Sequence, residues 1–119
     1  MSVMMKLKRS ECVILPLVLK KKWYDMIASG KKREEYRDAK EYYRIRISNF
    51  VRRGAEKNKQ LVVAFSLGMR KAELFMLFCG CKKFKTSLRP EWGEPNDYHY
   101  VISLGRRVKF IDESEASHG

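Results

Sequence analysis

The sequence predicts a small α+β domain in which about five strands form a mixed β-barrel with two flanking helices. Strand-like runs and helical periodicities follow one another in the order β-α-β-α-β-β-β. Apolar residues occupy both faces of the run 73–84, as in a strand of a small closed barrel with helices packed outside. The length of 119 residues fits one domain. We therefore expect a single domain over residues 1–111, starting with a basic arm at 1–10, and a short, mobile acidic tail at 112–119.

The first strand and the first helix have the clearest patterns. Residues Cys12–Leu19 are rich in Val, Ile and Leu, and Pro16 places this strand at an edge or a bulge because proline has no N–H. Residues 20–29 predict a helix with an apolar stripe formed by Trp23, Met26 and Ile27. Gly30 follows at the position where a left-handed residue closes a helix.

The remaining elements follow from alternation, capping and turn signals. Residues 32–38 alternate and predict a second strand. Asp38 and Glu41 have the spacing of an acidic helix cap, and the helical pattern that follows stops at Gly54. Later strands are expected over 61–66, 73–84 and 98–104, with a possible continuation at 108–111 and a proline-containing loop at 85–97.

The charge balance bears on the kind of partner. The chain has 26 Lys and Arg against 14 Asp and Glu, a net charge of +12. RNA or a nucleotide-like anion is the partner that this excess favours, and no segment predicts a membrane partner. No apolar run is long enough for a membrane span and no signal peptide is recognisable, so we expect a cytoplasmic protein. The oligomeric state stays open.

The three cysteines predict neither a disulfide framework nor a metal site. Cys79 and Cys81 form a C-x-C on an expected strand, but a zinc site needs four ligands and the two histidines are His99 and His118. We interpret the cysteines as structural residues and predict no metal and no cofactor.

Four stretches of the sequence contain motifs that occur together in one known protein family. Residues 23–37 contain an apolar helix followed by G-x-K-x-x-E-x-R, and the helix that follows has a related stretch at 40–46. The P-E-W-G-x-P loop at 90–95 and the closing strand at 98–105 are similar to those of a small phage and bacterial branch. Together these stretches resemble the ASCH family, and the resemblance covers about residues 12–108. It implies a PUA-like barrel with a cleft between the first helix and the sheet, and RNA binding. Enzymes of one distantly similar branch remove the acetyl group of N4-acetylcytidine by hydrolysis, and they use a Lys of this signature.

The signature residues are the first candidates for ligand contacts, and we expect them to line one concave site near the first helix. Glu35 and Arg37 should share a face of the second strand, where Arg37 would keep Glu35 ionised as an acceptor for a base amino group. The alternative is a partly exposed surface ion pair that contributes about 0–1 kcal/mol. Lys32 is a candidate for a phosphate contact or, if desolvated, for a nucleophile, and otherwise a solvated lysine.

Other candidates lie on neighbouring elements. Lys21 and Lys22 stand at the start of the first helix, where cations oppose the helix dipole unless an anion docks there. Arg46 lies in the second stretch of the resemblance. Trp92 either stacks on a base or plugs the open end of the barrel. The basic strand end at 82–85, which includes Phe84, is either a contact surface or a solvated edge.

Three functions follow from these observations. The leading hypothesis is an RNA-binding or nucleotide-binding ASCH module without an assigned activity. The alternative is a small amidohydrolase that acts on a modified nucleoside such as N4-acetylcytidine, with Lys32 and Glu35 as its catalytic residues. A second alternative is an adaptor that binds an acidic protein through its basic surface.

Overall fold

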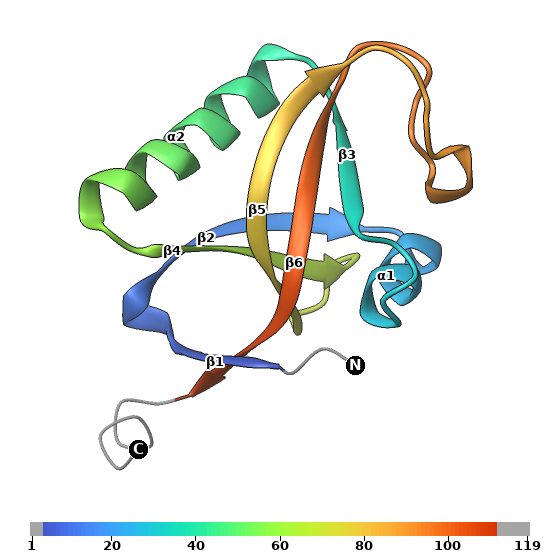
Figure 1. The fold of residues 1–119 in the computed structure, drawn as a ribbon. Helices are drawn as coiled ribbons and strands as arrows, with labels where there is room; N and C mark the ends of the chain where they lie inside the picture. The colour runs from blue at the N-terminus through green and yellow to red at the C-terminus, as the bar shows by residue number, and fades with distance from the viewer. Residues whose placement is uncertain (1–3, 112–119) are drawn as a thin grey trace.

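Six strands and two helices build the domain over residues 4–111, which are the residues that the computed structural model describes (Figure 1). The helices are α1 (Lys21–Ala28) and α2 (Glu41–Lys57), and short 3-10 turns occur at Arg9–Glu11 and Pro90–Trp92. The strands are β1 (Met5–Lys8), β2 (Cys12–Leu19), β3 (Glu34–Asp38), β4 (Gln60–Leu67), β5 (Leu74–Phe84) and β6 (His99–Ile111). The predicted α+β class is confirmed.

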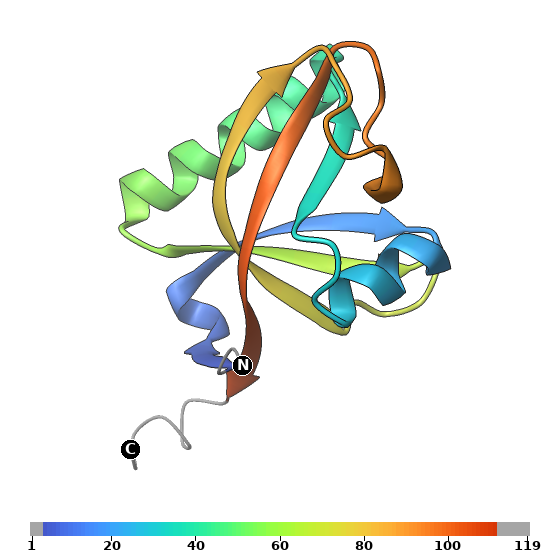
Figure 2. The same ribbon diagram turned by 45° about the vertical axis from the view of Figure 1, so that its right-hand side comes forward.

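The strands form one mixed sheet around β6. The sheet order is β1-β6-β5-β4-β2, and β3 also pairs with β6. One side of β6 carries β5, while its other side carries β3 near residues 99–103 and β1 near residues 108–111. The sheet is strongly curled (Figure 2). Within the described residues it does not close into the expected barrel, because β2 at one end pairs only with β4.

The free edge of β2 confirms the position predicted for Pro16. An unpaired edge strand exposes carbonyl groups that need other partners. Arg46 donates through Nη2 to the carbonyl oxygen of Pro16 at 2.6 Å, and Arg37 donates through Nη2 to that of Val18 at 2.8 Å. Two guanidinium groups from β3 and α2 therefore cover alternate carbonyls along this edge.

Helix α1 matches its prediction closely. It begins one residue later and ends one residue earlier than expected, and Gly30 has the left-handed φ of 84° that closes it. Ile27 is 1 % exposed and packs into the core, with Trp23 partly buried beside it.

Helix α2 differs from its prediction at both ends. Asp38 stays in β3, and the N-cap is Lys40, which makes no side-chain capping bond. The helix passes through Gly54 and ends at Lys57, followed by Asn58 with a left-handed φ of 52°. A Cβ at Gly54 would lie 2.4 Å from Cδ2 of Leu61, so this glycine allows α2 to approach β4 closely and does not stop the helix.

The basic arm expected at residues 1–10 contains a strand instead. Residues 5–8 pair in parallel with 108–111 of β6, which continues through Gly105 as one strand. Leu7 is 8 % exposed and packs with Cys12, Val62 and Val108 in a second apolar cluster. The acidic tail expected at 112–119 lies outside the described residues, and over residues 4–111 neither helix is long and apolar enough to cross a membrane.

Substitution of Leu7 tests the packing of β1. Leu7→Ala should lower the free energy of unfolding by about 2–5 kcal/mol, because it opens a cavity beside Val62 and Val108. The matched control is Met69→Ala, since Met69 is fully exposed. Denaturant unfolding measures both variants, and equal effects would show that β1 does not pack in solution.

Candidate functional site

The ammonium group of Lys32 lies at the centre of the candidate site. Lys32 is 2 % exposed, and its Nζ donates to the carbonyl oxygen of Trp92 at 2.6 Å. The same Nζ lies 3.3 Å from Oε1 of Glu35 and 4.6 and 4.7 Å from the ring centroids of Trp23 and Tyr36. Burial lowers the pKa of Lys32, and the neighbouring Glu35 carboxylate opposes that shift.

Local structure explains how Lys32 reaches this position. After Gly30, the Lys32 N–H donates to the carbonyl oxygen of Met26 at 3.0 Å, which turns the chain back under α1. Leu104 N–H donates to the carbonyl oxygen of Arg33 at 2.9 Å and guides the chain into pairing with β6. Lys32 is thereby held between the end of α1 and the start of β3.

Glu35 and Arg37 share a face of β3, as their spacing predicts. Oε2 of Glu35 accepts hydrogen bonds from Nε and Nη2 of Arg37 at 3.0 and 2.7 Å. Glu35 is only 5 % exposed, so the pair is not the partly exposed surface pair that was the alternative expectation. Lys32, Glu35 and Arg37 thus form one packed ion cluster with both Glu35 oxygens occupied.

Arg37 extends the cluster to α2 and to the edge of the sheet. Its Nη1 donates to the Tyr43 hydroxyl at 3.2 Å, and its Nη2 also reaches Val18 of β2. Burial lowers the pKa of Arg37, but Glu35 and Tyr43 outweigh that effect and raise it. The guanidinium therefore stays charged beside Glu35.

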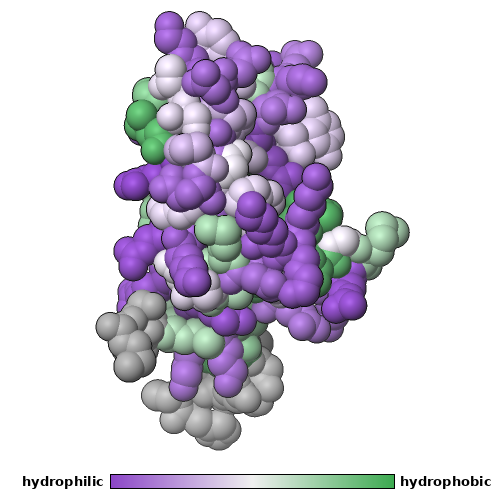
Figure 3. Space-filling model, turned by 90° about the vertical axis from the view of Figure 1, so that its right-hand side faces the viewer, coloured by the Kyte–Doolittle hydropathy of each residue, from purple (hydrophilic) through white to green (hydrophobic). Residues whose placement is uncertain are grey.

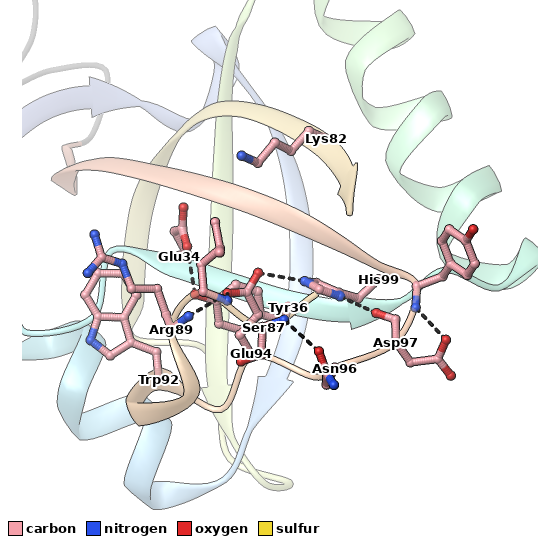
Figure 4. A network of polar contacts seen from close by, with 12 residues as sticks. Glu34, Tyr36, Lys82, Ser87, Arg89, Trp92, Glu94, Asn96, Asp97 and His99 are labelled. Atoms are coloured by element: carbon pink, nitrogen blue, oxygen red, sulfur yellow. Dashed lines mark hydrogen bonds and ion pairs between the residues drawn. The ribbon is translucent and has the colours of Figure 1, made fainter. Parts of the chain in front are cut away.

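The loop over residues 85–97 is held by a second buried network (Figure 4). Oε1 of Glu94 accepts the backbone N–H groups of Leu88 and Arg89 at 2.6 and 2.8 Å. Oε2 of Glu94 accepts from Nε2 of His99 at 2.8 Å, while Nδ1 of His99 contacts the carbonyl oxygen of Asp97. Burial raises the pKa of Glu94, but the hydrogen bonds from His99, Arg89 and Leu88 outweigh it and lower the pKa overall.

The same loop packs against α1. Gly93 has a φ of 81°, and a Cβ there would lie 2.6 Å from the Trp23 ring. The Trp92 side chain is half-buried, with the Arg89 guanidinium carbon 5.0 Å from its ring centroid. The Gly93 contact holds the loop against α1, and the Lys32–Trp92 bond joins residues 23–37 to the loop at 90–95.

The other predicted site residues lie around this cluster. Lys22 is exposed, and its Nζ lies 4.7 Å from the centroid of the Trp23 ring. The ammonium of Lys32 lies 4.6 Å from the centroid of the same ring. Lys21 points away and pairs with Asp25 at 2.6 Å on the exposed side of α1. Arg46 is bound to the β2 edge at Pro16.

Sequence reasoning missed four contributors to the site: Trp23, Tyr36, Glu94 and His99. The apolar stripe of the first helix included Trp23, but only as a core residue. The signal available for the Glu94–His99 pair was the spacing: Glu94 precedes His99, the first residue of a strand, by five residues. Among residues 4–111, no group of three His, Cys, Asp or Glu side chains could hold a metal ion.

Comparison with known proteins gives no relative. No protein-family model, no curated protein and no solved structure matches the chain.

Replacement of Glu35 tests whether the ion cluster is structural. Glu35→Gln should lower the free energy of unfolding by about 3–5 kcal/mol, because it leaves the buried Lys32 ammonium without its counter-charge. Glu56→Gln is the control, since the exposed Glu56–Arg52 pair contributes only about 0.5 kcal/mol. Chemical denaturation compares the two, and similar small losses would show that the cluster does not hold the fold.

The Glu94 network predicts an acid-sensitive stability. The folded-state pKa of Glu94 lies below the ordinary value of 4.5. The contribution of the ionised carboxylate to the free energy of unfolding is therefore fully present above pH 4.5, and it is lost as pH falls through the folded-state pKa. Glu94→Gln should cost about 3 kcal/mol at pH 7, and its difference from the parent should shrink as pH falls below 4.5.

Melting curves from pH 3 to 7 measure this difference, with the exposed Glu91→Gln in the same loop as control. A Glu94→Gln deficit that stays constant over that range would contradict the assignment of the ionised Glu94 carboxylate as the anchor of the loop.

Proposed function

We propose that this domain is an RNA-binding or nucleotide-binding module of the ASCH type. The observation that carries the proposal is the charge of the folded part. All 26 Lys and Arg residues lie within residues 4–111, against 11 of the 14 acidic residues. Such an excess repels itself in a small domain unless a polyanion binds.

The acidic residues leave most of this charge uncompensated. Several basic side chains in the described part of the chain form ion pairs with acidic ones, among them Lys21, Lys32, Arg37, Arg44 and Arg52. Glu35 and Glu94 are buried, so neither carboxylate lies on the surface that an incoming phosphate meets. Hydrophilic side chains cover most of the face shown in Figure 3, and the apolar ones form small separate patches.

A groove between α2 and the strand ends of β5 and β6 offers the surface best suited to a strand of RNA. This α2–β5 groove encloses about 390 Å³ and is lined in part by Val51, Arg52, Lys82, Lys83 and Tyr100. Near it, Tyr98 is 57 % exposed with Lys83 Nζ 5.3 Å from its ring centroid. Cations beside exposed aromatic rings are typical of proteins that bind single strands by phosphate attraction and base stacking.

The signature residues support such binding from beneath the surface. In this proposal the buried Lys32 and Glu35 position the groups around them, and Lys22, Trp92 and the accessible part of Arg37 contact the ligand. The finer fold assignment belongs to the same proposal: the curled sheet is an open form of the PUA-like barrel that the resemblance implies.

The geometry favours binding over amide hydrolysis. The lowered pKa of Lys32 is the one feature that suits a nucleophile. However, its amine is buried and bonded to the Trp92 carbonyl, so a substrate could reach it only if the loop over residues 85–97 moved away. Hydrolysis would be revealed by release of acetate from N4-acetylcytidine that disappears in Lys32→Gln.

Salt dependence of RNA binding is the decisive experiment. Affinity for a short single-stranded RNA pool should fall steeply with salt. Lys82→Gln with Lys83→Gln should reduce the log–log slope by about 1.4, which is about 0.7 for each phosphate that a lysine no longer neutralises. The matched control removes two exposed lysines at the far end of the sheet, Lys71→Gln in the turn before β5 and Lys109→Gln on β6. Fluorescence anisotropy at several salt concentrations measures the slopes.

Undetectable binding at low salt would refute the RNA proposal, and binding of acidic proteins alone would favour the adaptor.

A further inference from the structure

A second basic site lies on the other side of the Lys32 segment from the loop over residues 85–97. A cavity of about 280 Å³ separates the end of α1 from β5 and the second half of β6. Arg33, Arg106 and Arg107 border it, and we call it the arginine cavity. Lys32 also borders it, but the Lys32 ammonium is engaged by Trp92 and Glu35. The cavity is thus separate from the cluster described above.

The arginine cavity combines an apolar floor with an uncompensated cationic rim. Ile27, Met76 and Leu104 line it and are 1 %, 8 % and 8 % exposed, so they form a fixed floor. The three arginines are exposed, and in the part of the chain that the structure describes none of them forms an ion pair with an acidic side chain. Floor and rim together match a ligand with a flat or apolar body and a strongly charged anionic group.

A β-bulge explains how two successive arginines border one cavity. Successive residues of a regular strand point to opposite faces. Here Phe78 pairs with Leu104 but Met76 pairs with Arg107, so β6 advances three residues while β5 advances two. The extra residue on β6 breaks the alternation at positions 105–106, and bulges re-aim side chains in this way next to binding sites.

We propose that the arginine cavity binds a nucleoside 5′-monophosphate, either free or as the 5′-phosphorylated end of an RNA strand. A terminal phosphate carries close to two negative charges and three accessible oxygens, which suits several guanidinium groups, whereas an internal phosphodiester carries one charge. The base or sugar would lie on the apolar floor. The volume is slightly below the range of about 300–1,000 Å³ for small-molecule sites, which limits the ligand to about one nucleotide.

The test is a calorimetric titration of the whole protein with cytidine 5′-monophosphate. We expect one binding event, with cytidine binding at least about tenfold more weakly because it lacks the phosphate. Arg106→Gln with Arg107→Gln should weaken nucleotide binding by at least about tenfold. The control Arg53→Gln, an exposed arginine on α2, should leave it unchanged. Nucleotide binding that is undetectable at millimolar concentration would overturn the proposal.

A charge-neutral variant separates the cavity from general attraction to anions. Ala28 is exposed at the end of α1 and lines the cavity, so Ala28→Trp should fill it without changing the net charge. This variant should lose nucleotide binding and keep salt-dependent binding of the RNA pool. Unchanged nucleotide affinity in Ala28→Trp would show that the ligand lies elsewhere. Because the nucleotide titration contains no RNA, its outcome does not depend on the outcome of the RNA experiment.

Two oligonucleotides distinguish the sources of the ligand. A tetranucleotide with a 5′-phosphate should bind more tightly than its 5′-hydroxyl form, and Ala28→Trp should abolish that difference, if the ligand is an RNA end. Equal binding of the two forms, together with Ala28-sensitive binding of the mononucleotide, would assign the cavity to free nucleotides. If the two forms bind equally and the mononucleotide does not bind, the proposal is wrong.

Discussion

The buried ammonium of Lys32 is the interaction on which the neighbouring elements depend. A cation removed from water is costly unless nearby groups compensate it. Here a backbone carbonyl from the loop, a carboxylate from β3 and two aromatic rings supply that compensation. Since these groups come from α1, β3 and the 85–97 loop, their relative positions are set by one charged atom. Displacement of the loop would remove the Trp92 carbonyl, which is the shortest contact of the ammonium. The position of the loop and the protonation of Lys32 therefore depend on each other.

The basic residues of the domain divide into two groups with different tasks. Arg37 and Arg46 bind carbonyl groups of β2 and so protect an edge that would otherwise pair with another strand. Arg37 also balances Glu35, so a single guanidinium links the buried cluster to the sheet edge. By contrast, Lys82, Lys83 and the arginines of the cavity leave their charge exposed to solvent. Lys32, Glu35 and Arg37 thus hold the fold, whereas Lys82, Lys83, Arg106 and Arg107 supply charge that anions can reach.

Local patterns predicted most of the elements, and the failures involve distant partners. The bounds of β2, its edge position and the closure of α1 by Gly30 followed from neighbouring residues. Residues 5–8 gave no signal because four residues are too few for a periodicity and their partner lies about a hundred residues away. Gly54 looked like a stop signal because only the contact with Leu61 reveals its packing role. In the site, spacing predicted the Glu35–Arg37 pair, while the burial of Lys32 depends on a loop 60 residues further along the chain.

The position of β6 in the sheet has a consequence for synthesis of the protein. This strand pairs with β1, β3 and β5, yet it is the last element of the domain in chain order. Until residues 99–111 have emerged from the ribosomal tunnel, the nascent chain can assemble at most the β2–β4–β5 part of the sheet, and β1 and β3 lack their partner strand. Long-range pairing of this kind is slow and leaves strand edges exposed in the meantime. Completion of the fold is therefore expected after the domain leaves the ribosomal tunnel, in one late step in which β6 docks between strands that are already present.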